Sequence, residues 1–334
     1  MRALWAAVLT ASLTLSPATA GADPQAAPGF RLETFNIPGA IFAGLSRDGD
    51  QLLLTDLATG RLYRRGPDGG MLAFGPTLPH GLDVIGDPTG PYRVIRVGND
   101  HVVAQGWKPV DADESAYDHA LVAIGEDGKV RVITNDLWNP FDFVFSGGTY
   151  YVVDSARNSI ERVTADGTGR ETLRTFLRVN QAPEALQRLS PTEFSDERNY
   201  ETDAVPTGIA LSNGRLFVTL FGGFPFLPGS GMLMSIATTD GAPPPRVEFS
   251  GLNAPVDVAF EATGRILILE HGLYGLTDGF QAGSGRLLRC GHGDCQVILY
   301  GLTRPGSVLV WDDTRLVVSD LGGNLLFLQE AMPE

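Results

Sequence analysis

Hydrophobic positions along this chain occur in short alternating runs, separated by turns that are rich in proline and glycine. The clearest example begins at Pro206, where an apolar run is followed by a Ser-Asn-Gly turn at Ser212–Gly214. A β-branched and aromatic run, Leu216–Leu220, comes next. Asn and Gly tolerate the positive φ of tight turns, so this pattern predicts a β-hairpin.

The same unit of proline turn, apolar strand, turn and second strand recurs along the chain, which indicates a repeat fold. After most second strands come a third apolar run and an outer one, which together make four short strands per repeat. We therefore predict an all-β, six-bladed β-propeller. The six predicted copies are Pro38–Asp56, Pro79–Val97, Pro140–Asp154, Pro206–Leu220, Pro255–Glu270 and Pro305–Asp320.

The last copy lacks an outer strand, and the alternating run Phe30–Ile37 stands unassigned before the first copy. We expect this N-terminal strand to close the last blade, because a closed ring removes exposed sheet edges. Residues 23–334 then form one domain with insertions at about 98–119 and 172–202. The second insertion contains a possible short helix around Pro183–Leu189. Such insertions either decorate the surface or form walls of a binding site.

Residues 1–22 have the features of a secretory signal peptide. Arg2 is followed by an apolar stretch and then by small residues, with cleavage expected after Ala20 or Ala22. No cysteine follows the apolar stretch, which argues against a lipid anchor, and no later segment is apolar enough for a spanning helix. The sequence therefore predicts a periplasmic or secreted protein, and we expect a monomer.

Composition supports this interpretation and narrows the possible partners. The chain has 41 Gly and 22 Pro among 334 residues, in keeping with many turns. Its net charge of −14 argues against nucleic acid, because binding to phosphates requires clustered Lys and Arg. Cations or neutral molecules are the expected ligands.

Two cysteines, Cys290 and Cys295, lie in the sequence CGHGDC. In an exported protein we expect a disulfide that closes a tight loop. A metal site that uses both cysteines and His292 would need a fourth ligand, which the local sequence does not supply.

Four stretches carry a resemblance to a known family: VPTGIA, FGGFPFLPGSG, LNAPVDVAFEATGRILILEHG and GLTRPGSVLVWDDTRLVVSD. Together they resemble the ScyD/ScyE family of secreted propellers, named after members encoded with scytonemin pigment biosynthesis in cyanobacteria. The match covers about Phe30–Asn324, and Val205–Gly231 is its most specific part. More broadly the chain is similar to the NHL and SMP-30/gluconolactonase propellers. The resemblance implies fold and export more firmly than chemistry.

Strand order predicts that carboxylates gather at one mouth of the ring. Beside the axis, two residues after each proline, we expect Ala40, Gly81, Asp142, Gly208, Asp257 and Ser307. At the ends of second strands we expect Asp56, Asp154, Glu270 and Asp320. The alternative for the strand-end residues is that they cap the following loop and connect neighbouring blades.

The SMP-30-like resemblance implies metal ligands at comparable starts of inner strands. It makes Asp142 and Asp257, with Glu270 or Asp154 nearby, candidates for Ca²⁺ or another divalent metal. The alternative is that each Asp accepts backbone N–H groups at its own turn.

Imidazole and aromatic groups are expected at the same mouth. The catalytic candidates are His271, Glu270 and His80, because a neutral His beside carboxylates can serve as a base. The ligand-binding candidates are Phe221, Phe224, Phe226 and Tyr274, which suit an apolar or aromatic molecule. The alternatives are a hydrogen-bonded loop histidine and simple packing of the Phe-rich loop onto its blade.

Two functional hypotheses remain open. In the first, an exported propeller binds a small, possibly aromatic, molecule at the central mouth, with or without metal-assisted hydrolytic or oxidative chemistry. In the second, a non-catalytic module binds a protein or a glycan. The sequence contains no G-x-S-x-G elbow, Walker loop or H-E-x-x-H motif, which disfavours serine hydrolases, nucleotide enzymes and zincins.

Overall fold

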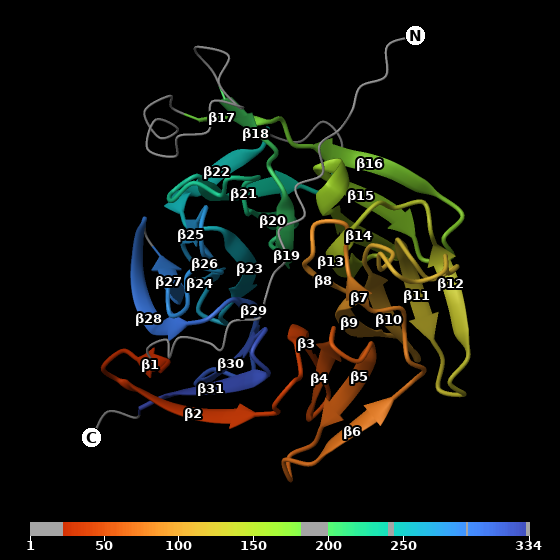
Figure 1. Cartoon of the computed structure of the whole chain (residues 1–334), viewed down its shortest axis with the longest axis horizontal. Coiled ribbons are helices and arrows are strands. Elements are labelled where there is room, and N and C mark those ends of the chain that lie inside the picture. The colour runs from red at the N-terminus through yellow and green to blue at the C-terminus, as the bar shows by residue number, and fades with distance from the viewer. Residues whose placement is uncertain (1–22, 182–199, 240–243, 292, 332–334) are drawn as a thin grey trace.

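The computed structural model describes residues 23–181, 200–239, 244–291 and 293–331. In these residues, six antiparallel sheets of at least four strands surround a common centre like the blades of a propeller (Figure 1). The same ranges contain no α-helix and no helix that could cross a membrane. The predicted six-bladed β-propeller is confirmed. The proposed signal peptide and the helix near Pro183 lie outside the described residues.

Each blade is numbered from its inner to its outer strand. The first contains β3 (Phe42–Asp48), β4 (Gln51–Asp56), β5 (Arg61–Arg65) and β6 (Met71–Phe74). The second contains β9 (Pro91–Val97), β10 (Asp100–Gln105), β11 (Ala120–Ile124) and β12 (Val130–Thr134). The third contains β13 (Pro140–Ser146), β14 (Thr149–Asp154), β15 (Ser159–Thr164) and β16 (Arg170–Thr175).

The remaining three blades follow in chain order. The fourth contains β19 (Pro206–Ser212), β20 (Arg215–Leu220), β21 (Gly231–Ala237) and β22 (Arg246–Leu252). The fifth contains β23 (Pro255–Phe260), β24 (Ile266–Glu270), β27 (Gly285–Gly291) and β28 (Asp294–Leu302). The sixth contains β29 (Pro305–Val310), β30 (Arg315–Asp320), β31 (Asn324–Glu330) and β2 (Phe30–Asn36).

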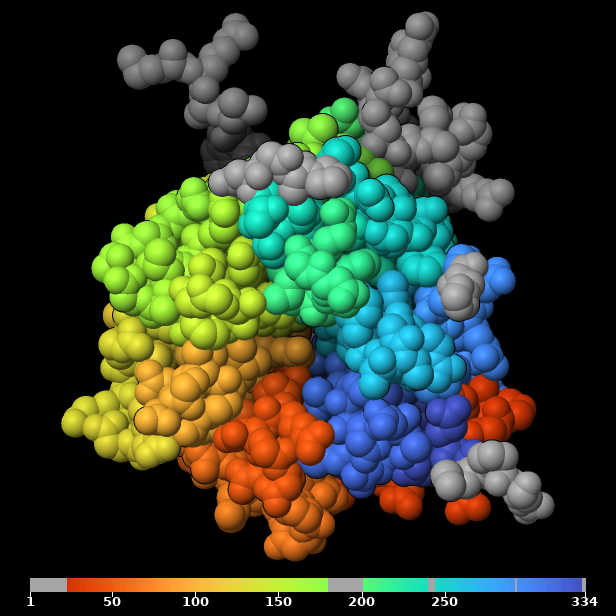
Figure 2. Space-filling view, turned by 180° about the vertical axis from the view of Figure 1, so that it is seen from behind, coloured from red at the N-terminus to blue at the C-terminus, as the bar shows by residue number. Residues whose placement is uncertain are grey.

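The N-terminal strand closes the ring, as predicted. Strand β2 pairs with β31 over its full length, from Phe30 opposite Glu330 to Asn36 opposite Asn324. Strand β1 (Gln25–Ala26) adds a short fifth strand to the edge of the fifth blade. Viewed from behind, the first blade (orange-red) and the last (blue) lie side by side (Figure 2).

The predicted second copy was misplaced. Its inner strand begins at Pro91 rather than Pro79, and residues 100–105 form its second strand instead of an insertion. Residues after Pro79 form a separate two-stranded ribbon, β7 (Gly81–Leu82) with β8 (Pro88–Thr89). Pro79, Pro88 and Pro91 all match the proline turn that precedes an inner strand, so this turn alone does not show where the blade begins.

Two further ribbons leave the blades. Strands β17 (Val179–Gln181) and β18 (Tyr200–Thr202) pair within the second predicted insertion, whose first residues belong to β16 instead. Strands β25 (Tyr274–Gly275) and β26 (Gly279–Phe280) form a small hairpin between β24 and β27 of the fifth blade.

Apolar side chains fill the spaces between adjacent blades. One buried cluster joins Leu267 and Leu287 of the fifth blade to Val318 and Leu326 of the sixth. Near the axis the inner strands approach so closely that two positions require glycine. A Cβ on Gly44 would lie 2.2 Å from the carbonyl oxygen of Tyr92, and one on Gly208 would lie 2.5 Å from the Cα of Asp257.

The predicted disulfide is present. Cys290 and Cys295 face each other on β27 and β28, and their sulfur atoms are 2.00 Å apart. Both thiols are therefore unavailable as metal ligands.

Candidate ligand site at the centre of the ring

A cavity of about 210 Å³ opens where the inner strands begin. Six residues occupy the same register position at its floor. In each blade, the last residue of the second strand pairs with a residue of the inner strand, and the floor residue stands two places after that partner. The six floor residues are Gly44, Arg93, Asp142, Gly208, Asp257 and Ser307. Arg93 and Gly44 take the places that the sequence had assigned to Gly81 and Ala40, and those two assignments were wrong.

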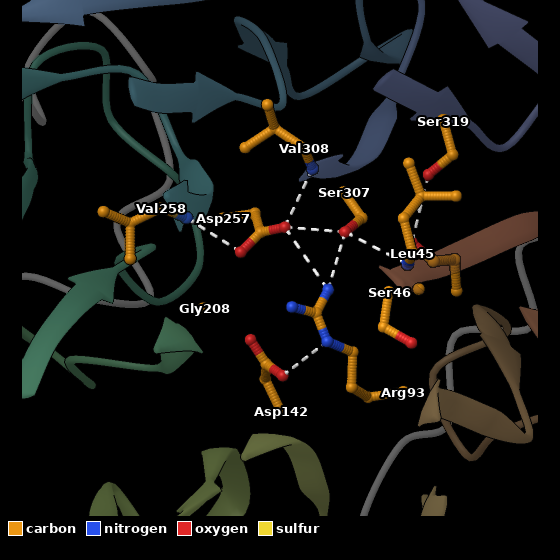
Figure 3. Close-up of polar contacts among 12 residues, drawn as sticks. Leu45, Ser46, Arg93, Asp142, Gly208, Asp257, Val258, Ser307, Val308 and Ser319 are labelled. Carbon is orange, nitrogen blue, oxygen red and sulfur yellow. Dashed lines mark hydrogen bonds and ion pairs between the residues drawn. The ribbon is translucent and has the colours of Figure 1, made fainter. Parts of the chain in front are cut away.

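Arg93 is the centre of this floor (Figure 3). Its Nε lies 3.1 Å from Asp142 Oδ1, within ion-pairing distance but not aligned as a hydrogen bond. Its Nη1 donates to Ser307 Oγ at 2.8 Å and lies 3.7 Å from Asp257 Oδ2. Nη2 makes no hydrogen bond or ion pair within the described part of the chain, so one donor of the guanidinium remains available at the cavity.

The two carboxylates also connect neighbouring blades. Asp142 accepts from its own neighbour Phe143 N at 2.7 Å and from Ile209 N of the next blade at 3.1 Å. Asp257 makes the equivalent bonds, to Val258 N at 2.8 Å and to Val308 N of the next blade at 2.9 Å. The repeat of this bond pattern shows that the position has a structural role as well as a place in the cavity.

Burial makes the floor sensitive to protons. Burial raises the pKa of Asp142 to about 7, because the pull of Arg93 in the opposite direction is weaker and Asp257 adds repulsion. Burial also opposes the charge of Arg93, but attraction to Asp142 and Asp257 outweighs it, so the pKa of Arg93 is raised. The guanidinium therefore stays charged while Asp142 exchanges a proton near neutral pH.

Aromatic rings form one side of the cavity. Phe221, Phe226 and Phe280 line it, and the ring centres of Phe226 and Phe280 are 5.4 Å apart. Tyr274 packs 5.0 Å from Phe226, and Phe224 packs 6.0 Å from it on the outer side of the cluster. The structure thus brings together all four predicted aromatic residues, although only Phe221 and Phe226 reach the cavity.

His271 also lines the cavity, but its nitrogens are already engaged. Nδ1 lies 2.9 Å from the carbonyl oxygen of Pro305, and Arg304 Nε donates to Nε2 at 3.4 Å. Burial and the nearby Arg304 lower the pKa of His271 to about 3. The ring is therefore neutral, with its proton assigned to Nδ1 by these partners, and it is a poor general base.

Arg304 links the two sides of the mouth. Its Nη2 forms an ion pair with Asp87 Oδ1 at 3.1 Å, and Asp87 belongs to the segment that joins β7 to β8. The nearby Asp83 is buried, and burial raises its pKa. The ribbon thus contributes charged groups to the rim opposite the aromatic side.

The four strand-end carboxylates do not reach the cavity. Each accepts hydrogen bonds from backbone N–H groups of an adjacent loop, either the loop that leads into the inner strand of its blade or the loop that follows the carboxylate. Asp154 binds Trp138 N and Asn139 N, both at 2.8 Å, and Glu270 binds Asn253 N at 2.8 Å and pairs with Arg286. Asp56 and Asp320 cap their loops in the same way.

His80 is likewise separate from the cavity lining. Its Nδ1 contacts the carbonyl oxygen of Leu78 at 3.0 Å. Of the three catalytic candidates, only His271 lies at the cavity, and none of them contacts Asp142 or Asp257 through a hydrogen bond in the described residues.

The residues present do not fit a divalent metal. The Arg93 guanidinium already forms ion pairs with both Asp142 and Asp257, and it supplies the positive charge that a metal cation would bring. Within the described ranges, no group of three or more His, Cys, Asp or Glu side chains is arranged to hold a metal ion. No step that depends on a metal is derived for this site.

Sequence reasoning missed Arg93, Phe280 and Arg304. The signal for Arg93 was present, because PYRV at Pro91 matches PFDF at Pro140 and PVDV at Pro255 position by position. Phe280 and Arg304 carried no such signal, since they reach the mouth through a hairpin and a loop whose shapes no repeat specifies.

The fold and the site define a propeller with a central ligand cavity, and solved structures share this fold. One is a catalytically inactive virginiamycin B lyase from Staphylococcus aureus with quinupristin, at 13% identity and TM-score 0.54, covering 90% of this chain and 99% of that one. Another is a gluconolactonase from Xanthomonas campestris, at 14% identity and TM-score 0.58, covering 90% and 89%. A third is the calcium-binding protein regucalcin from Agrobacterium tumefaciens, at 12% identity and TM-score 0.55, covering 88% and 91%.

At such low identity the likeness establishes the fold and no more. No protein-family profile matches the chain, and no curated protein matches it in sequence. The six-bladed propeller expected from the sequence is therefore confirmed, whereas membership of the ScyD/ScyE family stays a prediction.

Proposed function

We propose that this protein binds a small neutral molecule with an aromatic or apolar body and a hydrogen-bond acceptor at one end. The observation that carries this proposal is the Arg93 Nη2 donor, which is left available at the floor of a cavity with aromatic walls. An apolar pocket with a few convergent polar groups is the usual form of a small-molecule site.

Charge balance favours a neutral ligand over an anion. The floor holds one guanidinium against two carboxylates, so an anionic ligand would add a third negative charge to a buried site. A carbonyl group satisfies the free donor of Arg93 without this cost.

Export to the periplasm or the outside of the cell, and membership of the ScyD/ScyE family, belong to the same proposal. The disulfide supports export, since such bonds persist in oxidising compartments. The four quoted sequence stretches support the family.

A second candidate function, acid–base catalysis on the bound molecule, is favoured by one specific observation. Asp142 has a pKa of about 7 and lies at the floor of the cavity, as a general acid or base at neutral pH would. A lyase and a gluconolactonase share the fold, so a propeller of this kind can carry an enzymatic activity. Metal-assisted hydrolysis is the less favoured form of this candidate, because Arg93 holds the carboxylates.

A matched panel of benzamide, benzamidine and benzoate tests the binding proposal, since the three share a ring and differ in charge. By calorimetry at pH 8, we expect benzamide to bind about 10-fold more tightly than benzoate, because burying an unpaired charge is costly. At pH 5.5 this gap should narrow, as Asp142 takes up a proton.

If none of the three compounds binds, the central cavity is not a small-molecule site of this kind, and the result supports the protein- or glycan-binding hypothesis. Equal affinity for benzamide and benzoate at both pH values would contradict the charge argument.

A further inference from the structure

A second cavity, of about 640 Å³, lies between the first and last blades, away from the central site. We define it as the seam groove. On the sixth blade, Arg31, Gln329 and Arg315 form a row across β2, β31 and β30. On the first blade, Arg47 near the end of β3 and Arg65 on β5 line the same cavity. Four arginines therefore line one groove of a chain whose net charge is −14.

Two of these guanidinium groups lie over aromatic rings. Arg47 lies 4.8 Å from the ring centre of Trp311, and Arg65 lies 4.9 Å from that of Phe35 and 5.2 Å from that of Phe327. All three rings belong to the opposite blade. Stacking fixes the plane of a guanidinium and leaves its edge free to donate hydrogen bonds.

Three of the four arginines lack a carboxylate partner within the described ranges. Arg47 donates to two carbonyl oxygens, those of Gly49 at 2.6 Å and Trp311 at 2.5 Å. Arg65 Nε is buried with no hydrogen-bond partner in the described structure, and Arg31 forms no hydrogen bond or ion pair there. Only Arg315 is neutralised, by Asp312 at 2.6 Å.

Holding the blades together explains the stacking but not the excess of charge. Apolar residues fill the inner part of this same seam, as in the other seams, and neutral side chains could cover Trp311 and Phe327 equally well. The lining includes two acidic residues, Glu33 and Asp50, against the four arginines. The groove is thus a local excess of positive charge on an acidic protein.

We propose that the seam groove is a second binding site, for a ligand that carries carboxylate, sulfate or phosphate groups. Planar guanidinium groups bind such oxyanions through paired hydrogen bonds. The ligand is either a free anion or an acidic oligosaccharide, and the two share this chemistry. The site is independent of the central cavity and of the function proposed for it.

Calorimetry on the whole chain tests the proposal with four probes: inorganic phosphate, citrate, hexagalacturonate and the neutral sugar maltohexaose. We expect at least one of the three anions to bind and maltohexaose not to bind. The affinity should fall steeply when salt is raised to about 0.5 M, because exposed charges are screened. Tighter binding of hexagalacturonate identifies an acidic glycan, whereas tighter binding of phosphate or citrate identifies a free anion.

The key variant is Arg31→Glu, because Arg31 is exposed and its side chain makes no hydrogen bond or ion pair in the described structure. We expect it to weaken anion binding by at least ~5-fold. The matched control is Arg246→Glu, an equally exposed charge reversal on β22 of the fourth blade. It should change the affinity by less than about 2-fold, since its distance allows only screened interactions.

The melting temperatures of both variants should match that of the unaltered protein, which separates a binding effect from unfolding. Saturation with benzamide should leave anion binding unchanged. Failure of all three anions to bind, or an equal loss in both variants, would overturn the proposal.

Discussion

Two sets of carboxylates lie at the same end of the ring, and the sequence placed them together. The inner pair, Asp142 and Asp257, points to the axis and meets Arg93. The outer set, represented by Asp154 and Glu270, is separated from the inner pair by a single step across the blade. The side chains of the outer set bind backbone N–H groups of the loops instead.

The difference shows that side-chain direction, rather than proximity along the chain, decides which acid belongs to a site. Successive residues of a strand point to opposite faces, so a carboxylate at a strand end can be close to a cavity and still be excluded from it. The inner pair lines the cavity, whereas the carboxylates of the outer set accept hydrogen bonds from backbone N–H groups of the loops. The following predictions test this division.

Replacing the central cation should have the largest effect. Arg93→Met leaves two buried carboxylates without their partner, and we expect the free energy of unfolding to fall by ~3–5 kcal/mol. Urea denaturation measures this change. As a control, adding Asp142→Asn and Asp257→Asn should restore stability to within about 2 kcal/mol of the original, because the unpaired charges are then removed. A triple variant no more stable than Arg93→Met would show that charge is not the cause.

Removing an outer carboxylate should affect stability but not binding. Asp154→Ala leaves Trp138 N and Asn139 N without their acceptor, and we expect a loss of ~2–3 kcal/mol in urea denaturation. Benzamide affinity should change by less than about 2-fold, since Asp154 does not line the cavity. A large loss of affinity in the folded variant would break the division between the two sets.

The pH dependence of stability should report on the inner pair through Asp142. The pKa of Asp142 is about 7 in the folded protein and near 3.8 when unfolded, so the folded state binds more protons between these values. Stability contributed by this group is therefore present below pH 4 and is lost as pH rises through 7.

His271 acts in the opposite direction, because its folded pKa of about 3 lies below its unfolded value of 6.5. Its contribution is present above pH 6.5 and is lost as pH falls towards 3. The measurement is therefore the difference between the unaltered protein and Asp142→Asn, in which the His271 effect cancels. We expect this difference to change between pH 5 and pH 8, in favour of the variant at the higher pH. A constant difference would mean that Asp142 has an ordinary pKa.

The smallest effect should come from the aromatic side. Phe280→Ala removes a ring that lines the cavity, and we expect benzamide to bind about 5-fold more weakly, or ~1 kcal/mol. The matched control is Phe224→Ala, in the same cluster but outside the cavity lining, which should have little effect. His80→Ala should be as neutral as the control. Equal losses for Phe280→Ala and Phe224→Ala would mean that the cluster acts only through packing.

The repeat pattern was enough to predict the blade number and the closing strand, and the two cysteines of CGHGDC were enough to predict the disulfide. The repeat specified which residues alternate and where turns fall, and these features depend on local sequence. It failed at the second blade, where Pro79, Pro88 and Pro91 offered three equivalent starts. That single misplacement hid Arg93, the one cation of the cavity floor.

The rest of the site depends on geometry that the repeat does not encode. Phe280 reaches the cavity through the β25–β26 hairpin, and Arg304 through a loop with positive φ. His271 was recognised as a mouth residue, but its low pKa follows from burial and from Arg304, neither of which is local in sequence. These contacts join segments that are far apart in the sequence, so they can be predicted only once the blades have been placed relative to one another.

Pairing of β2 with β31 has a consequence for the order of events during synthesis. Apart from the short β1, strand β2 is made before any other strand of the six blades, but its partner β31 ends at Glu330, so the ring of blades cannot close until the sixth blade has been made. Long-range closure of this kind is slow and leaves a sheet edge exposed in the meantime. A change that weakens the pairing of residues 30–36 with β31 would therefore slow the final step of folding more than the formation of any single blade.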